Sequence, residues 1–226
     1  MEQVGLEEIM KHTKRVKIML NRDHKEVFSN IYDKDIWGNG SGSGSSYKYC
    51  KRYIEFLQKF MKEKQIKNVL DLGCGDWQFS QYVDWSGISY EGIDVVQSVI
   101  EANKEKHSAP HINFVQKNLS QVGLIIPYLK TDNQLILMKD VLMHWTNEEV
   151  EEWMDKFIPR LPLKTCFLIT NNWKYYRKPE RNEEPRELDK KFSWSPIDSQ
   201  KAPLNKYGFE IVFNYRVKQV SLYKSI

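Results

Sequence analysis

The feature that most constrains this chain is a short apolar run, residues 69–75 (VLDLGCG), that ends in two closely spaced glycines. Such a run is typical of a buried strand that turns sharply into the next element. In an open α/β sheet, ligands bind beyond the carboxyl ends of the strands, where glycines allow the backbone to approach them closely. A dinucleotide-binding turn has a third glycine, but this chain has Gln78 at that position. Pyrophosphate is therefore a poor ligand for this turn, and Asp71 favours a cationic one.

Strand-like and helix-like patterns alternate along the rest of the chain. Strands are expected at residues 68–72, 90–94, 111–116, 134–138, 166–170, 209–215 and 218–224. Helices are expected at residues 47–64, 96–106 and 147–158, and a helix or a helix pair at residues 6–28; a further helix is expected to begin near Trp77. This order predicts a single α/β domain with a Rossmann-like, seven-stranded, mostly parallel sheet, helices on both faces and an antiparallel last strand. Residues 1–64 would form extra N-terminal helices and a Ser/Gly-rich segment, and residues 65–226 the core.

Composition narrows the class of protein. A net charge of +4 over 226 residues is mild, which disfavours a nucleic-acid partner and suits a small polar or anionic one. No apolar run approaches the ~20 residues that span a bilayer, so we expect no membrane association and a cytoplasmic location. The three cysteines are far apart, which indicates neither a disulfide framework nor a metal site. A monomer and a homodimer are both consistent with the sequence.

Polar side chains recur where the predicted strands end. Asp94 ends the second strand, where a carboxylate accepts hydrogen bonds from ribose hydroxyls. Asn118 follows the third strand, placed to contact an adenine edge, and Lys139 and Asp140 follow the fourth. Because the carboxyl ends of parallel strands meet at one edge of the sheet, these residues predict a nucleoside site with Lys139 and Asp140 at its reactive end.

Residues 67–172 resemble the class I S-adenosylmethionine-dependent methyltransferases. Four segments are similar to the motifs of that family, namely residues 71–75, 92–94, 116–119 and 138–144. The resemblance implies that the cofactor is S-adenosylmethionine and the product S-adenosylhomocysteine. It also implies that the cofactor is held by Asp71, Gly73, Gly75, Asp94, Asn118, Leu119 and Lys139.

The segment before the first strand resembles a bacterial and viral branch of that family, several members of which lie among glycan-modifying genes. The branch has Trp-Gly followed by a Ser/Gly-rich loop, as in Trp37 and residues 41–45 here. It also has a late Arg-Pro-Leu-Asp element, which residues 186–189 match loosely because position 187 is Glu. By composition alone, residues 38–46 are also consistent with a flexible linker. The resemblance favours a lid in which Ser43 and Ser45 help to hold the cofactor's carboxylate and Trp37 packs over the site.

The candidate catalytic residue is His144, with Asp140 as a partner that orients it or binds substrate. A hydroxyl nucleophile must lose a proton, and imidazole is the usual acceptor near neutral pH. The alternative is that His144 only packs at the start of a helix. The segment after the fifth strand is basic and aromatic, and it forms either the substrate pocket or a solvated loop. Its candidate substrate-binding residues are Trp173, Tyr175, Tyr176 and Arg177, next to Lys174.

The leading hypothesis is O-methylation of a small polar metabolite, namely a sugar, a sugar phosphate or a nucleotide-linked precursor. A glycan or capsule precursor is the context that the resemblance implies. A second hypothesis is ribose 2′-O-methylation of RNA by a set comprising Asp140, Lys174, Glu210 and either Lys48 or Lys51. The sequence is also compatible with N-methylation of a small phosphorylated amine, and with a catalytically silent subunit that only binds the cofactor.

Overall fold

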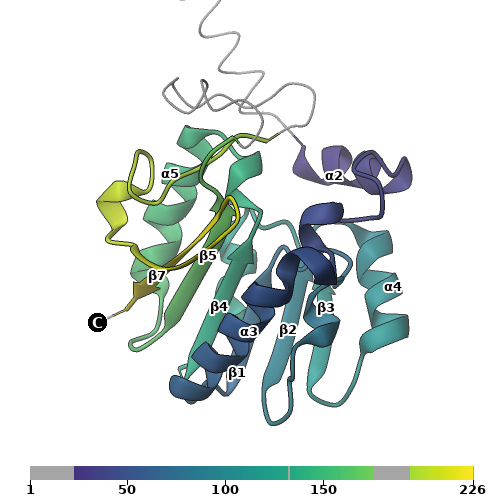
Figure 1. Cartoon of the computed structure of the whole chain (residues 1–226), viewed down its shortest axis with the longest axis horizontal. Coiled ribbons are helices and arrows are strands. Elements are labelled where there is room, and N and C mark those ends of the chain that lie inside the picture. Colours follow the sequence, from purple (N-terminus) through teal and green to yellow (C-terminus); the bar gives the residue numbers. More distant parts are fainter. Residues whose placement is uncertain (1–22, 132, 176–193, 226) are drawn as a thin grey trace, which may run out of the picture.

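The computed structural model describes residues 23–131, 133–175 and 194–225, and its centre is a seven-stranded sheet (Figure 1). The strand order is β3-β2-β1-β4-β5-β7-β6. The first five strands are parallel, and β7 runs antiparallel to both of its neighbours. This arrangement confirms the predicted Rossmann-like fold. The strands are β1 (Asn68–Leu72), β2 (Ser89–Asp94), β3 (Ile112–Gln116), β4 (Gln134–Lys139), β5 (Cys166–Asn172), β6 (Glu210–Tyr215) and β7 (Lys218–Lys224).

Helices cover both faces of the sheet because its central strands are apolar on both sides. Successive side chains point to opposite faces, so Val69 packs in one core and Leu70 in the other. The first core includes the apolar stripe of α3 (Tyr47–Glu63), and the second includes that of α5 (Asn147–Phe157). The capping box predicted at the start of α5 is present, because the side chains of Thr146 and Glu149 each bond the other's backbone N–H. The remaining α-helices in the described ranges are α2 (His24–Asp33) and α4 (Gln97–His107).

The prediction of a helix beginning near Trp77 is wrong. Between β1 and β2 the chain forms turns and one short 3₁₀ helix, Ser80–Tyr82. Trp77 itself has a φ of 60°, which is incompatible with a right-handed helix. Its side chain is buried among aromatic rings, including those of Trp85, Tyr90 and Phe114. Packing of this large indole thus overrides the helical preference of the neighbouring residues.

The helix expected over residues 6–28 is only partly described, since residues 6–22 lie outside the described part of the chain. The helix that is seen there, α2, begins after Asp23, whose carboxylate accepts a hydrogen bond from the Lys25 N–H. It ends at Asp33, five residues beyond the expected boundary, and it lies above the sheet in Figure 1.

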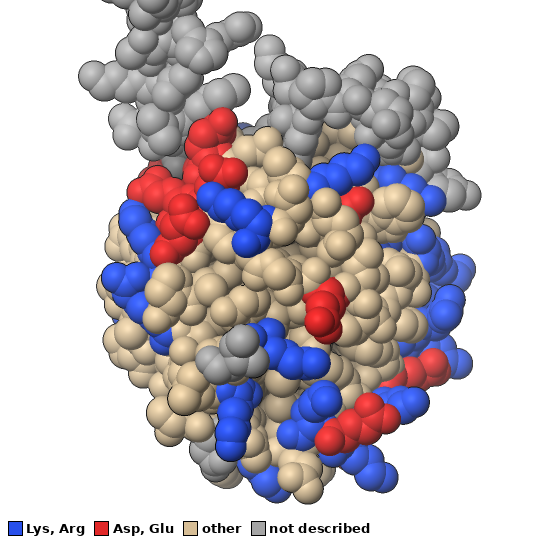
Figure 2. Space-filling view, turned by 90° about the vertical axis from the view of Figure 1, so that its left-hand side faces the viewer, with Lys and Arg blue, Asp and Glu red and all other residues tan. Residues whose placement is uncertain are grey.

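The surface gives no sign of a dense basic stripe on the side that Figure 2 displays, where Lys, Arg, Asp and Glu are interspersed around a largely uncharged centre. In the ranges that the structure describes, none of the helices combines the length and the apolar character needed to cross a membrane.

Candidate active site

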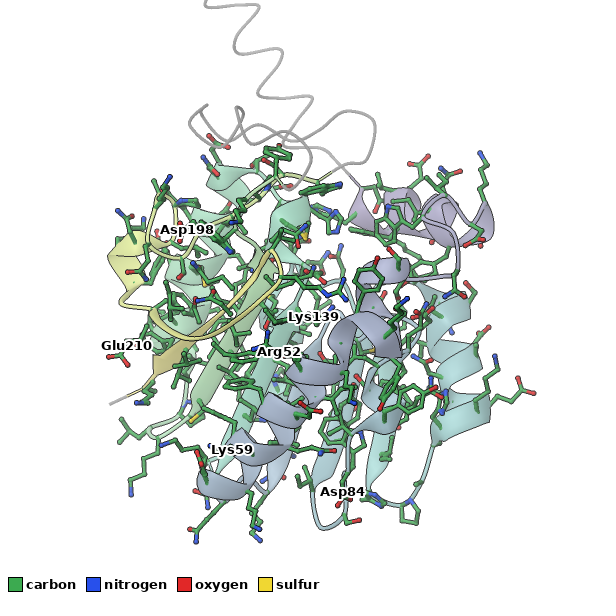
Figure 3. The ribbon with its side chains drawn as sticks, in the orientation of Figure 1. Arg52, Lys59, Asp84, Lys139, Asp198 and Glu210 are labelled. Atoms are coloured by element: carbon green, nitrogen blue, oxygen red, sulfur yellow. The ribbon has the colours of Figure 1, made fainter. Side chains whose placement is uncertain are left out.

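A cavity of about 1040 Å³ opens at the carboxyl ends of the parallel strands. Its walls come from the ends of β1 to β5, the Ser/Gly-rich segment, α2 and the hairpin between β6 and β7. Small-molecule sites commonly measure about 300–1,000 Å³, so this cavity has room for a cofactor and a second small molecule. Figure 3 shows Lys139, at the end of β4, near the middle of the molecule.

The turn after β1 brings backbone, without side chains, against the cavity. Gly73 and Gly75 have φ values of 82° and 54°, which glycine adopts without strain. A Cβ atom at position 73 would lie 2.3 Å from Val141 Cγ2, and one at position 75 would lie 2.5 Å from Ser41 Oγ. Glycine is therefore required here for close packing as well as for the turn.

Two buried carboxylates flank this turn. Asp94 accepts hydrogen bonds from the N–H groups of Gly75 and Val96, both at 3.0 Å, and keeps further lone pairs for a ligand. Burial raises the pKa of the Asp94 carboxyl, while the two N–H bonds oppose the rise. Asp71 accepts a hydrogen bond of 2.7 Å from the Tyr90 hydroxyl. Burial raises the pKa of Asp71 to about 6, although the Tyr90 bond works against it.

The residues after β3 also line the cavity. The Asn118 side-chain oxygen accepts hydrogen bonds from the Ser120 N–H at 3.0 Å and from the Ser120 hydroxyl at 2.8 Å. The side chain therefore caps a local turn through its oxygen, and its amide nitrogen takes no part in those bonds. Leu119 is held by its carbonyl, which accepts a 2.7 Å bond from the Trp153 indole N–H.

The Ser/Gly-rich segment is bound to the turn after β1. The Ser41 N–H donates to Asp76 Oδ2 at 3.0 Å, and the Asp76 N–H donates to Ser41 Oγ at 3.2 Å. The Tyr32 and Ser41 hydroxyls are joined by a 2.6 Å hydrogen bond. Ser43 and Ser45 then form a short 3₁₀ helix along the cavity wall. Sequence reasoning gave no role to Tyr32, which stands in no recognisable motif, or to Asp76, although Asp76 directly follows the glycine turn.

An aromatic wall closes the cavity beyond Lys139. The rings of Trp37 and His144 are stacked, with centroids 5.3 Å apart and planes inclined by 29°. Phe28 of α2 meets the His144 ring edge-on, also at 5.3 Å. His144 is 8% exposed and lines the cavity, as does the half-buried Trp37.

Asp140 lies between two lysines. One carboxylate oxygen accepts a 2.6 Å bond from Lys139, and the other accepts one from Lys218 at the start of β7. Burial alone would raise the pKa of Asp140, but the two ammonium groups lower it to about 2. Both oxygens of Asp140 are thus bonded to lysines, and its expected role in orienting His144 stays a prediction. Lys218 was not among the predicted site residues, because the pattern that predicts a strand does not indicate whether its first side chain faces a cavity.

The basic, aromatic segment after β5 is described only as far as Tyr175. Lys174 and Tyr175 line the cavity, whereas Trp173 packs its ring under the Lys174 ammonium, 4.4 Å away. Tyr176 and Arg177 lie outside the described residues, as do residues 186–189.

The structure does not assemble the residue set expected for RNA methylation. Asp140 and Lys174 line the cavity, but Glu210, Lys48 and Lys51 do not. Figure 3 shows Glu210 at the outer margin of the sheet, well away from Lys139. The cluster around Asp140 instead takes Lys139 and Lys218 as its cations.

The site fits an S-adenosyl cofactor. Gly73 and Gly75 line the cavity with backbone and no side chain, and the Asp94 carboxylate beside them is buried and also lines the cavity. Asp76 Oδ1 is buried and has no hydrogen-bond partner in the described part of the chain, so a ligand's donor would satisfy it.

Comparison with known proteins agrees with this geometry. Residues 70–157 match a family model described as a methyltransferase domain. No protein of curated function matches the chain in sequence. An S-adenosylmethionine-dependent methyltransferase from Anabaena variabilis ATCC 29413 has the same fold, with a TM-score of 0.64, 13% identity, and coverage of 91% of this chain and 96% of that one.

Two further similar structures contain S-adenosylhomocysteine. The Burkholderia thailandensis 1,6-didemethyltoxoflavin-N1-methyltransferase has a TM-score of 0.61, 16% identity, and coverage of 89% and 86%. The magnesium protoporphyrin IX methyltransferase of Synechocystis PCC 6803 has a TM-score of 0.60, 14% identity, and coverage of 89% and 100%. Other matched chains are longer, and this chain covers 48%, 58% and 56% of three of them.

The fold is an α/β sheet with a cavity at the carboxyl ends of its parallel strands, which is where folds of this kind bind their ligands. Residues 70–157 match the methyltransferase-domain model, and the chain shares its fold with solved methyltransferases, in line with the sequence resemblance.

Proposed function

We propose that this enzyme transfers a methyl group to a hydroxyl of a small polar acceptor, with His144 as the general base. The observation that carries the proposal is the stacking of His144 against Trp37 on the cavity wall beyond Lys139. A buried imidazole held between two aromatic rings has a fixed orientation, which a general base needs. Its position on the cavity wall supports contact with an acceptor.

The cofactor would be held by residues at the ends of β1, β2 and β3. Asp94 would accept from the ribose hydroxyls, and Asn118 and Leu119 would border the adenine. Asp71, Gly73 and Gly75 would lie along the amino-acid portion, with Lys139, Ser43 and Ser45 nearby. When bound, the cofactor supplies an activated methyl group on a sulfonium. The protein's own task is to orient the acceptor, exclude water and remove a proton from the attacking hydroxyl.

The acceptor is proposed to be a sugar, a sugar phosphate or a nucleotide-linked precursor of a glycan. Aromatic rings along the cavity, including Trp194 and Tyr175, offer flat apolar surface of the kind that packs on sugar rings. The glycan context rests on the resemblance of Trp37 and the Ser/Gly-rich segment to the bacterial and viral branch of the family. Two of the similar structures belong to enzymes named for toxoflavin-type and porphyrin substrates, which agrees with a small-molecule acceptor.

The test has two stages. Calorimetric titration with S-adenosylhomocysteine compares wild type with Asp94→Ala and with Asp84→Ala, a matched control at an exposed carboxylate far from the cavity (Figure 3). Asp94→Ala should weaken binding at least about tenfold, as expected for lost hydrogen bonds to a charged group, and Asp84→Ala should not. No binding by folded wild type would refute the proposal.

The second stage follows transfer of labelled methyl from the cofactor to panels of sugars, sugar phosphates, nucleotide sugars and phosphorylated amines. His144→Gln should lower the transfer rate by about 10² or more while leaving S-adenosylhomocysteine affinity unchanged. Methylation at nitrogen, or unchanged turnover by His144→Gln, would contradict the assigned chemistry.

A further inference from the structure

Three basic residues line the cavity on the side where β5 meets the hairpin between β6 and β7. Asn172 of β5 pairs with Lys218 of β7, and one residue further the Trp173 N–H donates to the Val217 carbonyl at 3.1 Å. These contacts set Lys174 beside the hairpin turn that contains Arg216. The side chains of Lys174, Arg216 and Lys218 all line the cavity.

Among the residues that the structure describes, one carboxylate faces the buried lysines at this end of the cavity. Lys139 and Lys218 are 7% and 9% exposed, and they share the single carboxylate of Asp140. Burying a charge without a counterion is unfavourable. Two ammonium groups that share one carboxylate would therefore be stabilised by one more anion. The other cavity-lining carboxylates are those of Asp71, Asp76 and Asp94, which belong to the ends of β1 and β2.

A second observation indicates a missing hydrogen-bond acceptor at the same place. Tyr215 is the register partner of Lys218 across the hairpin, is 3% exposed and lines the cavity. Its hydroxyl has no hydrogen-bond partner among the described residues, although buried hydroxyls are nearly always bonded. An anion beside Lys218 would provide the acceptor that Tyr215 lacks.

The arrangement is held in place before any ligand arrives. The Arg216 guanidinium lies over the Tyr49 ring, 4.1 Å from its centroid, on the first turn of α3. The Lys218 ammonium lies beside the Ser/Gly-rich segment, since a Cβ built on Gly44 would be 3.9 Å from Lys218 Nζ. Both hairpin cations are therefore held in place by contacts within the protein.

This volume is set apart from the nucleoside end. Three strands separate β7 from β2, which carries Asp94, and that corresponds to about 19 Å between the strand axes. The hairpin lies on the side of β4 that is away from β2 and β3, and Lys174 and Arg216 extend from that side. A ligand group bound there is best supplied by the acceptor.

We propose that Lys174, Arg216 and Lys218, with the Tyr215 hydroxyl, form an anion subsite for the acceptor. The acceptor then carries a phosphate or carboxylate group in addition to the hydroxyl that is methylated. This inference rests on the proposed function and narrows it to anionic acceptors.

The test uses inorganic pyrophosphate as the probe, titrated into the full chain with and without saturating S-adenosylhomocysteine and followed by calorimetry. Wild type should bind pyrophosphate, and Arg216→Met and Lys218→Met should each weaken that binding about tenfold, the usual effect of losing a charged hydrogen bond. Lys59→Met is the matched control, because its side chain is 77% exposed on α3 and lies far from the cavity (Figure 3). Arg216 is exposed, so its variant should fold even if Lys218→Met does not.

The anion bound at the subsite could come from the acceptor or from the cofactor's carboxylate, and the outcomes distinguish the two. Lack of pyrophosphate binding by wild type, or equal weakening by Lys59→Met, would overturn the subsite. The compound 5′-methylthioadenosine lacks the amino-acid tail of S-adenosylhomocysteine. If Lys218→Met weakens binding of S-adenosylhomocysteine but leaves binding of 5′-methylthioadenosine and of pyrophosphate unchanged, Lys218 binds the cofactor's carboxylate. The assignment of the subsite to the acceptor is then wrong. Failure of wild type to bind S-adenosylhomocysteine would refute the proposed function alone, because pyrophosphate is also titrated without it.

Discussion

Trp37 and His144, 107 residues apart in the chain, stack with their ring centroids 5.3 Å apart. The stacking joins the segment that leads into the Ser/Gly-rich region to the short 3₁₀ helix after β4, Leu142–His144. If Trp37 acts as a positioning residue for His144, a smaller side chain would release the imidazole. If it only fills space at the cavity wall, the catalytic step would not depend on its aromaticity.

Trp37→Ala is expected to lower kcat about tenfold with a smaller change in KM for the acceptor, since a misplaced base affects the chemical step most. Trp37→Phe should restore most of kcat because it keeps a ring against His144. The check is steady-state kinetics with an acceptor from the labelled-methyl screen. Equal kcat values for Trp37→Ala and Trp37→Phe would show that stacking does not position His144.

Asp71 makes the stability of the cofactor-free protein depend on pH. Its pKa is raised from 3.8 to about 6 by burial, so the folded protein binds this proton more tightly than the unfolded chain. This tighter proton binding contributes to the free energy of unfolding in full below about pH 3.8, and the contribution is lost as pH rises through about 6. Asp71→Asn has no group that ionises at this position. The free energy of unfolding of the variant minus that of wild type should therefore rise by up to about 3 kcal/mol from acidic to neutral pH.

Urea unfolding of wild type and Asp71→Asn, each without cofactor, at pH 4 and pH 7 measures this difference. Asn at position 71 can still accept the Tyr90 hydrogen bond, so the comparison isolates the charge. A stability difference that does not change with pH would mean that Asp71 titrates normally. The same substitution should weaken cofactor binding, because a carboxylate that faces the ligand is lost.

Asp140 is expected to be coupled to Lys218 in stability. Asp140→Asn leaves Lys139 and Lys218 buried without their shared carboxylate and should cost about 3–5 kcal/mol of unfolding free energy. Lys218→Met in the Asp140→Asn background removes one of the unpaired charges and should recover part of that loss. A double-mutant cycle by urea denaturation gives the coupling energy, and strict additivity of the two substitutions would contradict the ion-pair cluster.

The residues that could be predicted from sequence are those whose position follows from a strand end. Asp94 and Lys139 are the last residues of their strands and Asp71 is the last but one of β1, and parallel strands bring such ends together whatever the intervening loops do. The seven strands were predictable for the same reason, since their patterns are local.

The features that sequence reasoning missed depend on long-range packing. Trp77 lies where a helix is expected, but its indole packs in the core, and no local pattern signals the φ of 60° that results. Lys218 faces the cavity because β7 inserts between β5 and β6, and this strand order cannot be predicted from the sequence of the hairpin alone. Tyr32 lines the cavity and is bonded to Ser41, and both depend on the course of the chain after α2.

Contact between the Ser/Gly-rich segment and the glycine turn can be tested at Gly75. Gly75→Ala introduces two penalties: a left-handed φ of 54°, and a Cβ placed 2.5 Å from Ser41 Oγ. Gly87→Ala introduces only the first, because its φ is 73° and no atom lies within 4 Å of the new Cβ. Each left-handed alanine should cost about 1–2 kcal/mol of stability. Any excess in Gly75→Ala therefore measures the clash with the hydrogen-bonded Ser41 and Tyr32 hydroxyls, the latter 3.0 Å from the new Cβ.

If Ser41 must stay against the turn for the cofactor to be held, Gly75→Ala should also lower S-adenosylhomocysteine affinity at least about tenfold, as the displaced segment no longer lines the cavity. Gly87→Ala should bind as wild type does. Thermal unfolding and calorimetric titration on the two variants give both quantities. Equal loss of stability in the two variants, with unchanged affinity in Gly75→Ala, would mean that the segment yields freely to the new methyl group and does not hold the ligand.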